Sequence, residues 1–288
     1  MTKLPFTVAS VEARRAELMG QLERSPVVDI VGVVHARGCG GARSGGRQHW
    51  TLSFALAAWR YAGGPVQDRE LVIWKEPVNL SEIDVFRGSI RPFKVLKVRA
   101  RVAETNSFNS PRGLLVEVVA TDILDAELCA RAQELQNPIT FDDERLGTFT
   151  LNRAVNWYEC RTNWGAAPVL LTLSGDQPID LVGFDGGEST EALACAHALF
   201  RSQAEWDQRI RDFAVAELLD IKNAHWRHEG EREVGADQFK SKMTLESICV
   251  YADSSFEFLH HDGALFCGHS ILVSGNLAEG PTHADIAG

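Results

Sequence analysis

Hydrophobic and polar residues alternate along much of the first half of the chain, which predicts short β-strands joined by turns. Such runs cover residues 27–36, 50–59, 71–74, 90–102 and 114–120. Residues 8–24 and 122–136 instead place apolar side chains at helical spacing and predict two helices, and residues 79–82 predict a short helical turn. Several short strands with few helices predict a small barrel or a strongly bent sheet. An oligonucleotide-binding-type barrel is one candidate geometry.

A glycine-rich segment follows the first predicted strand. Residues 37–47 contain five glycines and three arginines. A phosphate-binding loop would need a Gly-Lys-Ser/Thr sequence or a third glycine at the right offset, followed by a helix, and this segment has neither. We therefore predict a flexible hairpin loop, with a basic loop that binds an anion or a partner as the alternative. Trp50 and Trp59 with Arg47 and Arg60 could form a nucleic-acid face, but tryptophans in a small barrel usually belong to the core, so nucleic-acid binding is not expected.

The second half of the chain mixes strand and helix patterns. Pro138 disfavours helical backbone at Asn137 and marks a boundary between domains of residues 1–137 and 138–288. Short antiparallel-type strands are predicted within residues 139–174, helices over residues 192–221 and 239–243, and a strand over 245–251. Residues 256–275 predict a β-hairpin with the tight-turn pair Asp262-Gly263. Strands, then helices, then strands predict an α+β fold, with an antiparallel sheet and helices packed on one face.

Composition and charge separate the two halves further. The 288 residues are 45% hydrophobic and 24% charged, as in globular proteins. No apolar run approaches the length of a membrane span, and no secretory signal is visible, so we expect a cytoplasmic protein with reduced cysteines. Residues 1–137 carry a net charge of +3 and residues 138–288 a net charge of −13. An acidic domain disfavours nucleic acid and suits a basic protein partner.

The predicted hairpin holds the densest group of reactive side chains. His269 and Asp262 are weak catalytic candidates, but His269 and Ser270 are neighbours on a strand and point to opposite faces, which argues against a Ser-His-Asp site. His260 and His269 are weak metal candidates across the hairpin, and His225 and His228 form a second pair. Zinc needs three or four converging ligands, so we expect no metal and no other cofactor. The simpler alternative for His269 is a structural histidine held by hydrogen bonds.

Aromatic side chains offer a different kind of site. Trp157, Tyr158 and Trp164 usually serve sheet packing in such a pattern, but on an exposed face they would anchor a protein partner. With Asp262 and His269, they are the candidate binding residues.

Several local patterns together resemble a known family. They are Phe141-x-Asp143-x-x-Leu146-Gly147-x-Phe149-x-Leu151-x-Arg153, Asn156-Trp157-Tyr158, Asn223-x-x-Trp226, Asp262-Gly263-x-Leu265-Phe266-x-Gly268-His269-Ser270-Ile271 and Ala284-Asp285-Ile286-x-Gly288. Over roughly residues 139–288 the chain resembles the bacterial domain-of-unknown-function family 2262 (DUF2262), with Cys267 where such domains usually carry an aromatic residue.

The resemblance implies no established activity and no catalytic residues. The C-terminal hairpin resembles those of several bacterial immunity-protein families, which bind and block a toxin, but a likeness of fold does not carry function. We expect a non-catalytic protein-binding module, with an immunity-like role as its specific form, and its oligomeric state is left open. The alternative is a metal- or small-ligand-dependent enzyme that uses the His260–Ser270 hairpin.

Overall fold

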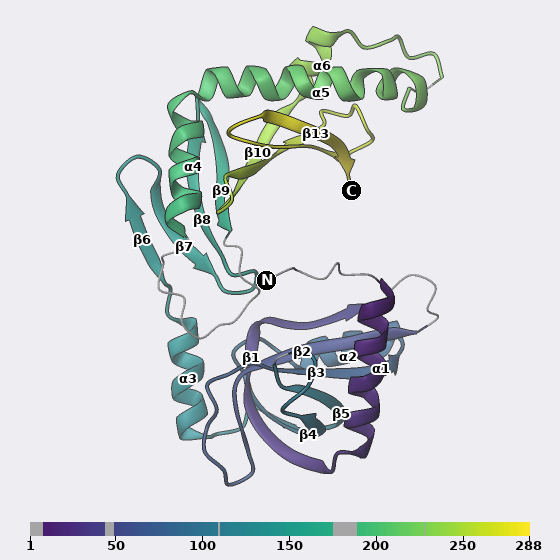
Figure 1. Ribbon diagram of the computed structural model, residues 1–288, viewed down its shortest axis with the longest axis vertical. Helices are drawn as coiled ribbons and strands as arrows, with labels where there is room; N and C mark the ends of the chain where they lie inside the picture. Colours follow the sequence, from purple (N-terminus) through teal and green to yellow (C-terminus); the bar gives the residue numbers. More distant parts are fainter. Residues whose placement is uncertain (1–7, 44–48, 109, 175–188, 228) are drawn as a thin grey trace. The chain divides into compact units, whose positions relative to one another are not determined.

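A computed structural model describes residues 8–43, 49–108, 110–174, 189–227 and 229–288, and these residues form two compact units (Figure 1). One unit comprises the described residues up to Pro138, and the other comprises those from Ile139 onward. Each unit buries its own hydrophobic core. None of the helices in these ranges is long and apolar enough to cross a membrane.

The first unit is a closed five-stranded barrel with the strand order β1-β2-β3-β5-β4. Its strands are β1 (Val27–Ala42), β2 (Trp50–Tyr61), β3 (Leu71–Val78), β4 (Val95–Ala103) and β5 (Arg112–Thr121). Strands β3 and β5 run parallel, and the other neighbouring strands run antiparallel. The barrel predicted from the sequence is confirmed. The closed five-stranded arrangement fits the oligonucleotide-binding type of barrel.

Strand β1 is longer than its sequence pattern predicted. It continues past residue 36 to Ala42, with shifts of its pairing with β2 between Val33 and Cys39 and a positive φ of 63° at Gly38. The prediction of a flexible loop is therefore wrong for residues 37–42, because the glycines allow the strand to bend and keep its pairing with β2. Residues 44–48 lie outside the described part of the chain. Trp59 is fully buried in the core, as the sequence interpretation favoured.

Three helices pack on the barrel: α1 (Val8–Arg24), α2 (Leu80–Ser89) and α3 (Ala126–Gln136). Leu18 and Leu22 of α1 pack against Ala103 of β4. Helix α2 replaces the short turn predicted at residues 79–82, because Asn79 and Glu82 form a reciprocal capping box that starts a full helix. Helix α3 begins later than predicted, after the N-cap Asp125.

The second unit is built on an eight-stranded sheet with the order β13-β12-β11-β10-β9-β8-β7-β6. Its strands are β6 (Thr140–Asp143), β7 (Gly147–Asn152), β8 (Trp157–Trp164), β9 (Ala167–Ser174), β10 (Thr244–Tyr251), β11 (Ser255–His261), β12 (Ser270–Asn276) and β13 (Gly280–Ala287). The predicted antiparallel arrangement holds for every pair except β9 and β10, which run parallel. The long helical excursion between these two strands permits this, since a parallel pair needs a crossover connection.

Helices α4 (Ser189–Arg201), α5 (Gln203–His225) and α6 (Ala236–Lys242) cover one face of this sheet (Figure 1). The core between the layers combines Leu199 of α4, Ile210 and Leu218 of α5, and inward-facing strand residues such as Phe256 and Val273. The other face of the sheet carries the alternate residues of each strand. The α+β class predicted for this domain is confirmed.

The hairpin predicted over residues 256–275 differs at its connection. Strands β11 and β12 do pair antiparallel, with His261 opposite Ser270. The tight turn predicted at Asp262-Gly263 is wrong, since residues 262–269 form a longer loop. Leu265 and Phe266 resembled strand residues because they are apolar, but their side chains are buried within the loop without strand pairing.

Candidate functional site

Asp262 organises the loop between β11 and β12. Its side chain is fully buried and accepts hydrogen bonds from the backbone N–H groups of Ala264 (3.1 Å), Phe266 (2.5 Å) and Gly268 (3.2 Å). Burial alone would raise the pKa of the Asp262 carboxyl, but these N–H donors, with help from His261, hold the pKa below its usual value. The carboxylate therefore acts as an internal cap for the loop.

The backbone conformation and the close packing at position 263 both favour glycine. Its φ is +55°, and a Cβ atom built at this position would lie 2.5 Å from the backbone oxygen of Lys242. The close approach allows the Lys242 ammonium group to donate to the Gly263 carbonyl at 3.0 Å. The loop is thereby tied to the end of helix α6.

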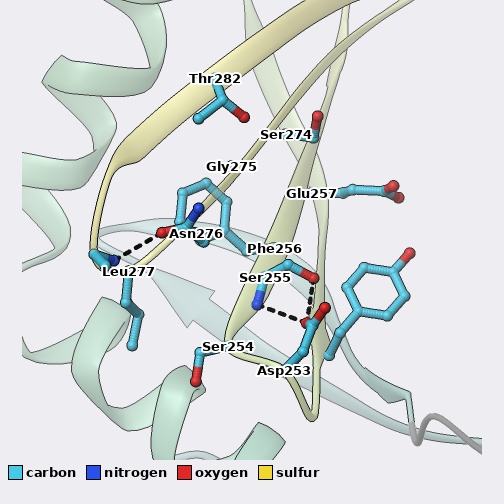
Figure 2. A pocket seen from close by; sticks show the side chains of 12 residues that line it. Asp253, Ser254, Ser255, Phe256, Glu257, Ser274, Gly275, Asn276, Leu277 and Thr282 are labelled. Carbon is cyan, nitrogen blue, oxygen red and sulfur yellow. Dashed lines mark hydrogen bonds between the residues drawn. The ribbon is translucent and has the colours of Figure 1, made fainter. Parts of the chain in front are cut away.

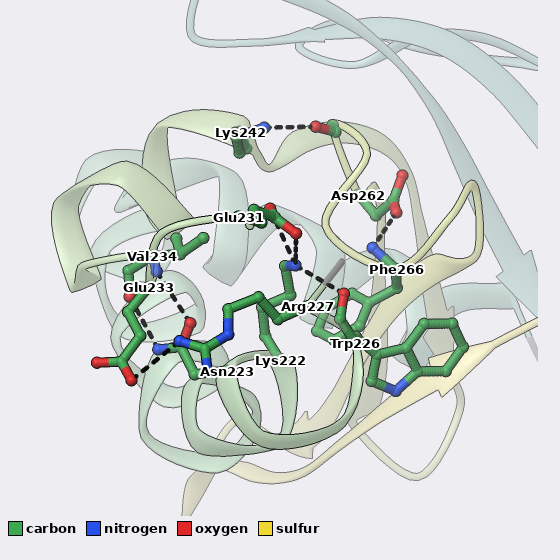
Figure 3. Close-up of polar contacts among 11 residues, drawn as sticks. Lys222, Asn223, Trp226, Arg227, Glu231, Glu233, Val234, Lys242, Asp262 and Phe266 are labelled. Atoms are coloured by element: carbon green, nitrogen blue, oxygen red, sulfur yellow. Dashed lines mark hydrogen bonds and ion pairs between the residues drawn. The ribbon is translucent and has the colours of Figure 1, made fainter. Parts of the chain in front are cut away.

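A second set of polar contacts fixes the segment after α5 (Figure 3). The Asn223 amide donates to the Val234 carbonyl at 3.0 Å and accepts from the Val234 N–H at 2.9 Å. The buried Lys222 ammonium donates to the Trp226 carbonyl at 2.8 Å and pairs with Glu231 at 3.2 Å. These contacts close the loop that leads from α5 toward α6.

The two sets meet at an aromatic cluster. The Trp226 ring lies 5.7 Å from the Phe266 ring and 5.2 Å from the His269 ring, all measured between centroids. The Nδ1 atom of His269 lies 2.7 Å from the Phe266 carbonyl oxygen and donates to it. The motif residues Asn223, Trp226, Asp262 and His269 therefore share one structural task, which is to hold two loops against each other.

The catalytic and metal candidates are not brought together by this arrangement. Within the described residues, no hydrogen bond joins His269 to Asp262 or to Ser270. His260 lies on β11 opposite Ile271, whereas His269 lies in the loop. The described residues also hold no group of three or more His, Cys, Asp or Glu side chains placed to share a metal ion. His228 of the second predicted pair lies outside the described residues.

His260 is unusual for another reason. Its side chain is fully buried, and neither ring nitrogen makes a hydrogen bond of normal geometry. Burial, with a smaller contribution from the charge of Arg211, lowers the pKa of His260 to about 4 despite the opposing effects of Asp207 and of the backbone at Phe258 and Ile271. His260 is therefore a neutral core residue at neutral pH.

The aromatic binding candidates divide by exposure. Tyr158 and Trp164 are buried, with 5% and 6% of their surface exposed. They therefore do not lie on an exposed face that could anchor a partner. Tyr158 packs against Phe141, and Trp164 packs against Phe200 and Phe258. Trp157 is half-buried and, by the alternation of β8, belongs to the sheet face opposite the helices.

A polar pocket of about 670 Å³ lies at one end of that face (Figure 2). It is formed by the β10–β11 turn with the start of β11 and by the end of β12 with the turn into β13. Its polar lining includes Tyr251, Asp253, Ser255, Glu257, Ser274, Asn276 and Thr282. Sequence reasoning missed this pocket, because its residues come from two turns that approach each other only once the strands pair.

The two carboxylates of the pocket differ in their surroundings. Asp253 accepts hydrogen bonds from the Ser255 hydroxyl at 2.5 Å and the Ser255 N–H at 2.9 Å, and these bonds lower the pKa of Asp253. Glu257 lies opposite Cys249 and Ser274 on the neighbouring strands. Burial, Cys249 and Glu257 raise the pKa of Tyr251, so its phenol keeps its proton at neutral pH. The pocket therefore presents negative charge beside an aromatic hydroxyl.

The charge of the surrounding strands has the same sign. Residues 244–288, which include β10 to β13, contain six carboxylates and no Lys or Arg. The absence of Lys and Arg from residues 244–288 can be seen in the sequence itself, within the acidic half of the chain. Asp253 and Glu257 of this set line the pocket, whereas Asp262 is buried in the β11–β12 loop.

Comparison with known proteins gives family assignments without an activity. Residues 143–286 match the model of a family described as an uncharacterised protein conserved in bacteria (DUF2262). Residues 14–135 match a second model, described as a domain of unknown function (DUF7021). The first match confirms the resemblance seen in the sequence, and the second covers the barrel unit. A search of curated proteins found no match.

Proposed function

The chain belongs to the DUF2262 family of uncharacterised bacterial proteins, and we propose that its C-terminal unit is a non-catalytic module that binds a basic protein partner. The observation that carries the proposal is the composition of residues 244–288, which contain six carboxylates and no Lys or Arg. Two of these carboxylates, Asp253 and Glu257, line the pocket. An immunity-like role, in which the basic partner is a toxin, is the specific form of this proposal.

The pocket suits a cationic side chain of such a partner. Its volume of about 670 Å³ exceeds that of an arginine side chain, and Asp253 and Glu257 supply carboxylates for a guanidinium or ammonium group. The Tyr251 ring adds an aromatic surface over which a cation is attracted. A single exposed ion pair contributes only about 0.2–1 kcal/mol, so two carboxylates that contact the same cation would add to each other.

The surrounding charge supports recognition at longer range. Field lines from an acidic surface raise the encounter rate with a basic partner, and this steering weakens as salt rises. At about 0.15 M ionic strength the screening length is about 8 Å, so moderate salt should weaken capture without abolishing contacts in the pocket.

A pull-down of the full chain from its native cell extract, at low and moderate salt, tests the proposal. Bound proteins are identified by mass spectrometry, and the partner is then titrated against Asp253→Asn/Glu257→Gln. Both substitutions keep the side-chain size and remove charge. We expect a stoichiometric, basic, salt-sensitive partner whose affinity falls about tenfold or more in the double variant.

Glu217→Gln/Asp220→Asn is the matched control, since it removes the same charge from exposed positions on α5. Equal weakening by the two double variants would mean that total charge, and not the pocket, determines binding. An extract that yields no basic partner at either salt concentration would contradict the proposed function itself.

A further inference from the structure

Another, smaller pocket in the acidic unit is lined by positively charged side chains. It has a volume of about 260 Å³ and is lined by residues from four places: the β6–β7 turn, the end of β8, the last turn of α4 and the first residue of α5. Its polar lining includes Arg145, Thr162, Asn163, His197, Arg201 and Gln203. Two arginines thus line one pocket in a domain whose net charge is −13.

The position of Arg145 is set by Asp143. One oxygen of the Asp143 carboxylate accepts the N–H groups of Arg145 (3.0 Å) and Leu146 (2.9 Å), and the other lies 2.8 Å from Nε2 of His197. Burial would raise the pKa of Asp143, but these donors lower it, so the carboxylate stays ionised. Asp143 therefore shapes the turn and joins it to α4.

Arg201 reaches the same pocket from the helix. His197 and Arg201 are four residues apart on α4, which places them on one helical face. Neither Arg145 nor Arg201 has an ion-pair partner within 4 Å in the part of the chain that the structure describes. Both arginines are exposed and line one small pocket, so an anion bound there would be attracted by both guanidinium charges.

The backbone around the pocket is nearly balanced in charge. The C-terminal end of α4 contributes partial negative charge, and the N-terminal end of α5, which begins at Gln203, contributes partial positive charge. The Gln203 side chain fixes this junction, because it accepts from the Gly165 N–H at 2.9 Å and donates to the Asn163 carbonyl at 3.2 Å. The charge of the pocket therefore follows from its side chains, which are the two arginines and His197 with its ionised partner Asp143.

We propose that this pocket binds an oxyanion of phosphate size, either inorganic phosphate or the phosphate group of a small ester. The guanidinium groups of Arg145 and Arg201 would each offer paired N–H donors, the geometry that phosphate oxygens accept in bidentate fashion. The Thr162 hydroxyl is a neutral donor for a further oxygen. The inference does not depend on the proposed protein partner, since it uses a different pocket and a ligand of opposite charge.

Calorimetric titration of the full chain at low ionic strength tests the site, with inorganic phosphate in one series and O-phosphoserine in another. Wild-type protein should bind at least one of them with a dissociation constant below about 1 mM. Arg145→Gln and Arg201→Gln should each weaken binding about tenfold or more. Tighter binding of O-phosphoserine would identify an ester as the ligand, and tighter binding of phosphate would identify the free anion.

Arg161→Gln is the matched control. Arg161 is an exposed arginine on β8 whose side chain, by alternation, points away from the face that carries Thr162. Its replacement should change the affinity less than twofold, and near-ultraviolet circular dichroism should show that all three variants keep the wild-type fold. Binding weaker than about 1 mM for both ligands would overturn the proposal, and so would an Arg161→Gln effect as large as that of Arg201→Gln.

Discussion

Replacement of His260 by leucine should make the C-terminal unit less sensitive to acid. The His260 ring is fully buried and neither nitrogen makes a hydrogen bond of normal geometry, so leucine removes two poorly satisfied polar atoms from the core. At pH 7 we expect a free energy of unfolding within about 1 kcal/mol of wild type, because replacement of an unpaired polar group by an apolar one of similar volume is close to neutral.

The effect of pH follows from the histidine's pKa. In the folded unit burial lowers the pKa of His260 to about 4, whereas an unfolded histidine has a pKa of about 6.5. Between these values the unfolded chain binds a proton that the folded unit does not, so wild-type stability falls as pH decreases from 6.5 to 4. A difference of roughly 2.5 units corresponds to about 3 kcal/mol, and His260→Leu should lack this loss.

Urea unfolding at several pH values measures the effect, with hydrogen exchange at β11 and β2 amides used to follow the two units separately. The barrel serves as an internal reference, because the substitution lies outside it. His283→Gln, which removes an exposed histidine from β13, should keep the wild-type pH dependence. The reasoning is refuted if His260→Leu loses more than about 2 kcal/mol at pH 7, or if its stability falls with acid as steeply as that of wild type.

Two further predictions concern the contacts that hold the loops. Asp262→Ala leaves three backbone N–H groups without their buried acceptor, so it should lower the free energy of unfolding by about 3 kcal/mol or more. The midpoint of urea unfolding measures this loss, and Glu246→Gln, at an exposed position, should have little effect. A loss below about 1 kcal/mol would mean that other acceptors replace the carboxylate. Asn223→Ala removes both hydrogen bonds to Val234 and should cost about 2 kcal/mol, with faster exchange of the Val234 amide. Unchanged exchange at Val234 would count against this account.

The alternation of apolar residues was enough to predict the barrel and most strands of the sheet. It was not enough where burial occurs without strand pairing. Leu265 and Phe266 are apolar because they fill the core, yet their backbone belongs to a loop folded around the Asp262 carboxylate. The Asp262-Gly263 pair correctly signalled a change of direction. It could not reveal that the Asp262 side chain accepts N–H groups as far along as Gly268.

Longer-range order was beyond the sequence pattern for a different reason. The parallel pairing of β9 with β10 depends on where the chain returns after α4, α5 and α6, and no local spacing encodes that return. The same holds for both pockets. Glu257 and Ser274 lie opposite each other only through the register of β11 and β12. Arg145 and Arg201 line one pocket only because the β6–β7 turn packs beside α4.

The family motif and the two pockets share Leu146 but otherwise consist of different residues, and this separation has a physical basis. Asp143, Asn223 and Asp262 use their side chains to satisfy backbone groups, so substitution would damage the fold whatever the ligand. Glu257 and Arg201 face pockets, where a substitution changes charge without loss of packing. Asp143 links the two classes, because the same carboxylate that shapes the β6–β7 turn also places Arg145 at the rim of the basic pocket. A scaffold of this kind can keep its loops fixed when a substitution changes the charge around a pocket.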